Sequence, residues 1–83
     1  MDVRLTAAAQ RELTELNEPL VSRITGILER LNNWPTVSGV KPLRGKLAGR
    51  FRIRTGDYRV QFYIGGNAVI VEKIGHRDGF YEE

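Results

Sequence analysis

The chain has 83 residues, of which 13 are basic and 10 are acidic, so its net charge is +3 and its length allows one small domain, residues 1–83. It has no cysteine and one histidine, which excludes a disulfide framework, a thiol nucleophile and a zinc site of the usual Cys/His type. The longest aliphatic run, residues 68–71, is too short to cross a membrane, and residues 1–4 lack the apolar core of a signal peptide, so we expect a soluble cytoplasmic protein.

The first part of the chain predicts one strand and two helices. Val3 and Leu5 alternate with polar neighbours, as in a half-buried strand, and Thr6 follows at a helix N-cap position. Pro19 separates two stretches with helical spacing of apolar residues, since proline is tolerated in a first turn. Their apolar faces are Ala9, Leu13 and Leu16 in the first and Leu20, Ile24, Ile27, Leu28 and Leu31 in the second. The pattern indicates a helix hairpin.

The second part predicts a loop and three strands. Residues 32–49 contain prolines and glycines without a regular apolar period, which favours a loop. Residues 50–54 and 59–64 alternate apolar with polar side chains, and residues 68–74 are more continuously apolar, as in a central strand. Turns are expected at 56–57 and 65–67. The order β-α-α-β-β-β predicts an α+β fold, in which the helix hairpin packs on one face of a small antiparallel sheet.

The positive charge is concentrated in one stretch. Residues 41–61 carry a net charge of +6, whereas residues 1–40 carry −1 and residues 62–83 carry −2. The basic side chains are Lys41, Arg44, Lys46, Arg50, Arg52, Arg54 and Arg59, set against Asp57 alone. An edge strand protected from aggregation needs only one or two such charges. The run therefore favours a polyanionic partner, and a phosphodiester is the commonest candidate.

Strand alternation predicts where these cations lie. If Phe51, Ile53 and Val60 face the helices, the other face of the sheet carries Arg52, Arg54, Arg59, Gln61 and Tyr63. A guanidinium grips a phosphate through paired hydrogen bonds and also stacks on a base. Arginine interleaved with an aromatic side chain suits single-stranded RNA. The pattern does not separate an RNA-binding protein from an enzyme.

The C-terminal segment adds three chemically active side chains within six residues: His76, Arg77 and Tyr81. Each has a plain structural alternative. His76 is equally consistent with a surface residue after a strand, and Tyr81 with an aromatic that packs on the sheet. Arg77 would form an exposed salt bridge, which contributes little to stability.

Three blocks of the sequence together resemble the RelE/ParE toxin superfamily: residues 43–54, residues 56–60, and residues 74–78 with Tyr81. The resemblance covers the whole chain. It implies a toxin of a type II toxin–antitoxin system that enters the ribosomal A site and cuts messenger RNA. It also implies a cognate antitoxin that neutralises the toxin by wrapping its surface.

The resemblance also implies roles for individual residues. Arg52 and Arg54 match strand residues that contact the scissile phosphate, and Arg59 matches an arginine that stabilises the transition state. Arg77 matches a second phosphate-binding arginine, and Tyr81 a tyrosine of the RNA-cleaving members. The charge run adds further expected phosphate contacts: Arg44, Lys46 and Arg50.

Cleavage by the ribose 2′-hydroxyl needs a proton acceptor, stabilisation of charge on the phosphorane and a proton for the leaving oxygen. Arginine does not readily lose its proton, so Arg52 and Arg54 are poor bases where several relatives have lysine. We therefore hypothesise His76 as the acid or base, assisted by Tyr81. No metal or cofactor is expected.

Two other functions fit the same pattern. One is a ParE-like inhibitor of DNA gyrase, which would have no need of Arg59, Arg77 and Tyr81 together. The other is a non-catalytic RNA-binding module. For a toxin, we expect an acidic or amphipathic antitoxin to be attracted by the stretch of +6 charge.

Overall fold

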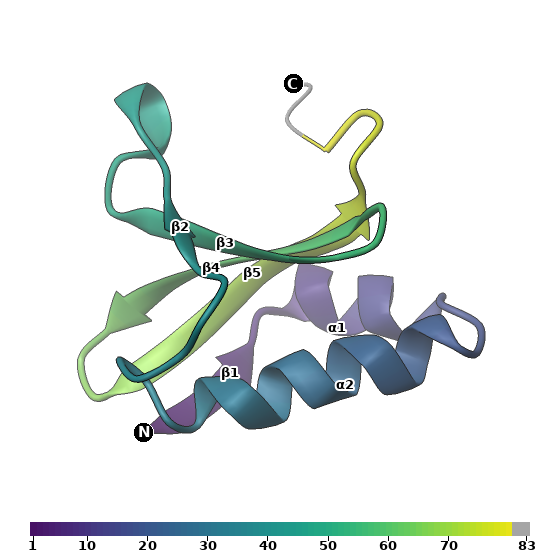
Figure 1. Cartoon of the computed structure of the whole chain (residues 1–83), viewed down its shortest axis with the longest axis horizontal. Helices are drawn as coiled ribbons and strands as arrows, with labels where there is room; N and C mark the ends of the chain where they lie inside the picture. The colour runs from purple at the N-terminus through teal and green to yellow at the C-terminus, as the bar shows by residue number, and fades with distance from the viewer. Residues whose placement is uncertain (81–83) are drawn as a thin grey trace.

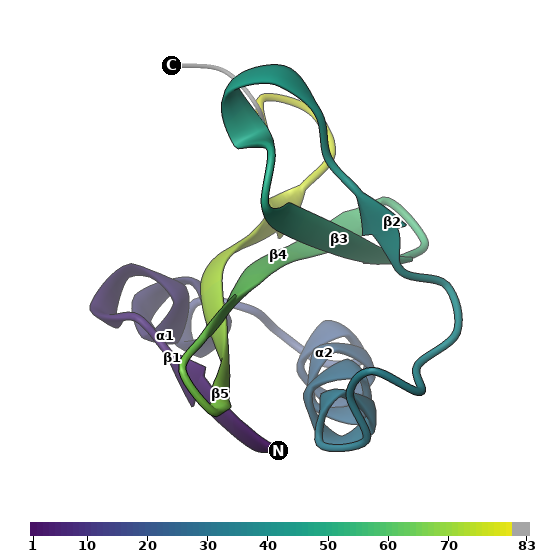
Figure 2. The same cartoon turned by 90° about the vertical axis from the view of Figure 1, so that its left-hand side faces the viewer.

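The computed structural model describes residues 1–80, in which two helices lie under one face of a twisted five-stranded sheet (Figures 1 and 2). The elements are β1 (Asp2–Leu5), α1 (Ala7–Thr14), α2 (Leu20–Leu31), β2 (Lys41–Pro42), the 3-10 turn η1 (Gly45–Leu47), β3 (Arg50–Thr55), β4 (Tyr58–Gly65) and β5 (Ala68–His76). The sheet order is β1-β5-β4-β3-β2. The α+β class and the predicted helices and strands are confirmed. Neither helix is long and apolar enough to cross a membrane.

The sheet is mixed rather than wholly antiparallel, because β1 pairs with β5 in the parallel direction. Asp2 lies opposite Ala68 and Leu5 lies opposite Val71. The alternation of apolar residues predicted β1 as a strand but not its direction, since side chains alternate in the same way in both directions. The pairing gives β5 a neighbour on each side, which confirms its predicted central position.

Two short elements lie inside the segment predicted to be a loop. β2 pairs with β3 so that Lys41 is opposite Arg52 and Pro42 is opposite Phe51. Two residues are too few to show an alternation, so no local pattern predicts this strand. After β2, η1 rises from the side of the sheet opposite the helices (Figure 1). The segment therefore frames the face of the sheet that the helices leave uncovered.

The core lies between the helices and the sheet, and Trp34 closes one side of it. Fully buried apolar side chains come from α1, α2, β3, β4 and β5: Ala9, Ile24, Leu31, Ile53, Val60, Phe62, Val69 and Val71. The ring of Trp34 meets those of Phe51 and Phe62 edge to face, with centroids 4.9 Å and 5.4 Å apart. Because the helices and the core cover one face of the sheet, the opposite face is not covered by a helix. We call it the open face.

A β-bulge at Glu72 changes the alternation along β5. Gln61 lies opposite Lys73 and Phe62 lies opposite Val71, so Glu72 has no partner in β4. Val71 before the bulge and Ile74 after it are both buried in the core. In a regular strand, two residues three places apart face opposite sides, so the bulge is what allows both Val71 and Ile74 to face the core. The bulge therefore exchanges the two faces of β5 from this point onward.

Helix α1 supplies a hydrogen bond that β1 is too short to provide. Glu12 Oε1 accepts a hydrogen bond of 2.8 Å from the backbone N–H of Ile74. Glu12→Ala is expected to lower the free energy of unfolding by about 1.5–3 kcal/mol, because the amide loses a charged acceptor. Urea unfolding measures the effect. The exposed Glu29→Ala serves as control, and equal midpoints for the two variants would show that this bond contributes nothing.

Candidate functional site

Cationic side chains from three adjacent strands gather on the open face. Lys41 lies opposite Arg52, and Arg54 lies opposite Arg59. As the alternation predicted, these side chains alternate with Ile53 in the core. Like charges directly opposite each other destabilise a sheet. A bound anion would relieve that repulsion.

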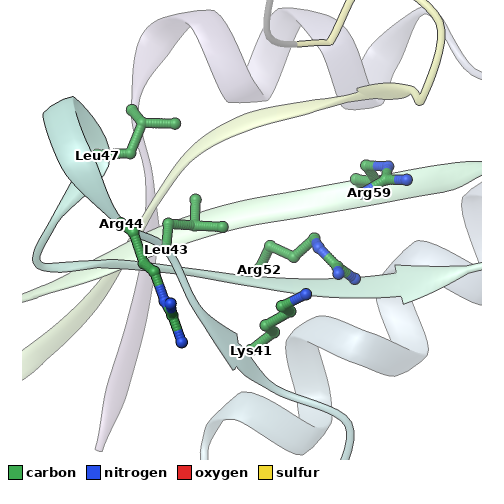
Figure 3. Close-up of a pocket in the computed structure, with 6 residues that line it drawn as sticks. All are labelled: Lys41, Leu43, Arg44, Leu47, Arg52 and Arg59. Carbon is green, nitrogen blue, oxygen red and sulfur yellow. The ribbon is translucent and has the colours of Figure 1, made fainter.

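Part of this face is hollowed into a pocket of about 270 Å³, shown in Figure 3. Its lining residues, which define the face pocket, are Lys41, Leu43, Arg44, Leu47, Arg52 and Arg59. Figure 3 shows the ends of the Arg52 and Lys41 side chains directed the same way, whereas Arg44 extends away from Arg59. Arg52 and Arg59 are half-buried, and no carboxylate of residues 1–80 is among the lining residues. The charged side chains that line the face pocket are therefore all cationic.

The lining residues favour charge stabilisation over proton transfer. A guanidinium offers several N–H donors in a fixed plane and binds phosphate through two parallel hydrogen bonds. Arg52 on β3 and Arg59 on β4 present such groups from neighbouring strands, whose pairing fixes their spacing. Positive charges fixed in advance are effective where negative charge develops in a transition state. The arrangement suits a phosphate ester.

Of the other four expected phosphate contacts, one lines this pocket and three do not. Arg44 lines it, but Lys46 on η1 and Arg54 on β3 are exposed and lie outside its lining. Arg50 is drawn away by the bulge, because its Nε donates a hydrogen bond of 2.9 Å to Glu72 Oε2. Its guanidinium also lies 5.2 Å from the centre of the Tyr63 ring. Arg50 therefore forms an ion pair with Glu72 and does not line the face pocket.

The structure does not bring His76 to the face pocket. His76 pairs with Tyr58, and the two rings meet edge to face with centroids 5.3 Å apart. Tyr58 packs against the core, so His76 lies on the helix side of the sheet and Arg59 on the other. The physical reason is the bulge at Glu72. Residues of β5 after the bulge that would face away from the helices in a regular strand face toward them instead. The expected proton transfer by His76 at a phosphate held by Arg59 therefore lacks the required geometry.

Arg77 is held at the end of the sheet, outside the lining of the face pocket. Its backbone N–H donates a hydrogen bond of 2.7 Å to the carbonyl of Asp57. Its Nε lies 3.8 Å from a carboxylate oxygen of Asp57 and 3.8 Å from one of Asp78. These are exposed ion pairs, which contribute little to stability. They leave the Arg77 side chain 59% exposed.

The C-terminal segment returns over the open face and is anchored there by Phe80. This side chain is only 2% exposed and packs on Gly75, where an added Cβ would lie 3.4 Å from the Phe80 ring. Gly75 is the register partner of Arg59, so the ring lies beside the arginines. The Lys73 ammonium lies 4.6 Å from the ring centre. Tyr81 follows next in the sequence and lies outside the described residues.

Sequence reasoning missed two residues of this face. Lys41 was counted only in the charge run, because β2 was not predicted and its pairing with Arg52 could not be seen. Phe80 was not singled out, because an aromatic residue near a chain end gives no sign of where it packs. The Gly75-to-Phe80 spacing alone does not reveal a ring stacked on a strand glycine.

Comparisons with known proteins agree with this fold. Residues 3–79 match the family described as the ParE toxin of the type II toxin–antitoxin system parDE. Toxin RelG of Mycobacterium tuberculosis is 33% identical over 82 residues, which cover 95% of this chain and 93% of that protein.

Two solved structures are similar over most of their length. The toxin–antitoxin complex RelBE2 from M. tuberculosis matches with a TM-score of 0.79 and 32% identity over 92% of this chain and 96% of the other. The RelB–RelE antitoxin–toxin complex from Methanococcus jannaschii matches with a TM-score of 0.77 and 22% identity over 94% of both chains. Because the family match spans nearly the whole sequence, the chain belongs to the RelE/ParE superfamily of toxins from type II toxin–antitoxin systems.

Proposed function

We propose that this toxin is an endoribonuclease that cleaves messenger RNA at the ribosomal A site and thereby inhibits translation. The observation that carries the proposal is the face pocket, whose lining brings Arg52 and Arg59 together with Lys41 and Arg44. The 33% identity to Toxin RelG supports a RelE-type activity over other activities of the superfamily.

In the proposed reaction the ribose 2′-oxygen attacks the adjacent phosphorus and the bond to the 5′-oxygen breaks. The products are a 2′,3′-cyclic phosphate and a 5′-hydroxyl. Arg52 and Arg59 stabilise the charge that builds up on the non-bridging oxygens. The 2′-hydroxyl must lose a proton and the 5′-oxygen must gain one. Tyr81 is the remaining sequence candidate for that transfer, and Arg77 is retained as a second phosphate contact.

Mapping transcript ends after induced expression tests the proposal. The parent is expected to produce new ends within translated reading frames. Arg52→Ala is expected to reduce their yield by about tenfold to a hundredfold, because a hydrogen bond from a charged donor is lost. Arg23→Ala removes the same charge from an exposed position on α2 and serves as control. No new ends with the parent, on or off ribosomes, would overturn the proposal.

We also propose that a cognate antitoxin forms a complex with this chain. The similar chains from M. tuberculosis and M. jannaschii were solved in toxin–antitoxin complexes. The stretch of +6 charge at residues 41–61 would attract an acidic partner. Such a partner would compete with RNA for the same cations.

The match to the ParE family favours a second candidate, inhibition of DNA gyrase. A supercoiling assay run in parallel with the mapping of transcript ends separates the two. Inhibited supercoiling without transcript cleavage would replace the proposed nuclease with a gyrase inhibitor. RNA binding with neither effect would indicate a non-catalytic binding module.

A further inference from the structure

A second hollow adjoins the face pocket and shares part of its wall. It has a volume of about 540 Å³, and its lining residues, which define the edge pocket, are Lys41, Pro42, Leu43 and Arg44. Three of these residues also line the face pocket. β2 is the last strand of the sheet, so the edge pocket lies at the rim of the open face. The two hollows together form one surface that runs from β4 across β2.

The charge of the edge pocket is not neutralised within the part of the chain that the structure describes. Lys41 and Arg44 are exposed, and neither forms an ion pair with a carboxylate of residues 1–80. Arg50 is different, because Glu72 already binds its guanidinium. Figure 3 shows Arg44 extending away from Arg59, so its charge lies toward the edge rather than over the face pocket.

The edge pocket also offers apolar surface beside these charges. Leu43 is half-buried and lines both hollows, whereas Pro42 lines the edge pocket alone and, as the register partner of Phe51, has its side chain on the helix side of β2. Cations next to apolar side chains suit a nucleotide, whose phosphate needs the charge and whose sugar or base packs on apolar surface. A simple inorganic anion would not use Leu43.

We propose that the edge pocket binds the nucleotide next to the one held in the face pocket, so that single-stranded RNA crosses the sheet edge over β2. Lys41 and Arg44 hold the phosphate between the two nucleotides, and Leu43 contacts the neighbouring sugar or base. The continuity of the two hollows favours RNA over a protein partner here. This inference rests on the proposed ribonuclease function, because it takes the face pocket as the site of the reacting phosphate.

Binding of a short 2′-O-methyl RNA tests the inference, since this RNA lacks the 2′-hydroxyl needed for cleavage. Fluorescence anisotropy gives the slope of log affinity against log salt concentration. The double variant K41A/R44A is expected to lower the magnitude of that slope by about 0.7, the value for one phosphate contact on a single strand. Its affinity is expected to fall about tenfold. R11A/R23A removes two exposed charges from α1 and α2 and is the matched control.

The outcomes separate this inference from the proposed function. If the parent cleaves messenger RNA but K41A/R44A keeps the parent slope, the edge pocket does not hold a phosphate and the nuclease proposal stands. If the parent neither binds the 2′-O-methyl RNA nor cleaves transcripts, both fail. If K41A/R44A keeps its RNA slope and loses antitoxin binding, the edge pocket serves a protein partner and the inference is overturned.

Discussion

Arg59→Ala is expected to slow messenger RNA cleavage by about 10²–10³-fold, the usual effect of removing a fixed group that stabilises transition-state charge. Arg59 is half-buried and projects from β4, which has a strand on each side. Its position is therefore more constrained than that of an exposed arginine. A charge held in a partly desolvated site interacts more strongly with developing negative charge than one in water. Single-turnover cleavage in a translating extract measures the loss.

Two further variants isolate the origin of that effect. Arg59→Lys keeps the charge but loses the paired donors, so its rate should fall between those of the parent and Arg59→Ala. Arg54→Ala removes the charge directly opposite in the ladder but outside the face pocket, and we expect a loss of less than about tenfold. Equal losses in Arg54→Ala and Arg59→Ala would mean that general positive charge, not the pocket, drives cleavage. Circular dichroism confirms that the variants fold.

Phe62→Ala is expected to lower the free energy of unfolding by about 3–5 kcal/mol. Phe62 is fully buried, and its ring packs against those of Trp34 and Phe51. A chain of this length has a total stability of roughly 4–12 kcal/mol, so this one change removes a large part of it. Urea unfolding followed by the fluorescence of Trp34, the single tryptophan, reports on the same cluster.

The size of the substituted side chain provides the control. Phe62→Leu fills most of the cavity and should cost less than Phe62→Ala. Thr25→Ala, at an exposed position on α2, should change stability by no more than about 0.5 kcal/mol. A loss below about 1 kcal/mol for Phe62→Ala would contradict the packing described for the core.

The sequence could predict the cationic face because covalent geometry makes side chains alternate along a strand. Arg52 on β3 and Arg59 on β4 follow this rule, because the pairing of β3 with β4 contains no bulge. Thr6 is likewise confirmed as the N-cap of α1, since its hydroxyl accepts a hydrogen bond from the Ala9 N–H. These features depend on residues close together in the sequence.

The features that were missed depend on pairing between distant segments. β2 is a strand only because Lys41 and Pro42 meet β3, and no local pattern marks two residues. The direction of β1 is set by where β5 lies. The face on which His76 lies depends on the bulge in the pairing of β5 with β4, which alternation within β5 does not reveal. Composition and alternation record none of these contacts.

That extra residue has a consequence for how the strand tolerates changes in length. Deleting Glu72 would leave a regular ladder in which Ile74 still lies opposite Val60 and His76 still lies opposite Tyr58, so every later side chain would keep its present side. Deleting Lys73 as well would place Ile74 directly after Val71, which would turn Ile74 toward water and bring His76 to the side of Arg59. The strand is therefore expected to tolerate the loss of one residue at this point better than the loss of two.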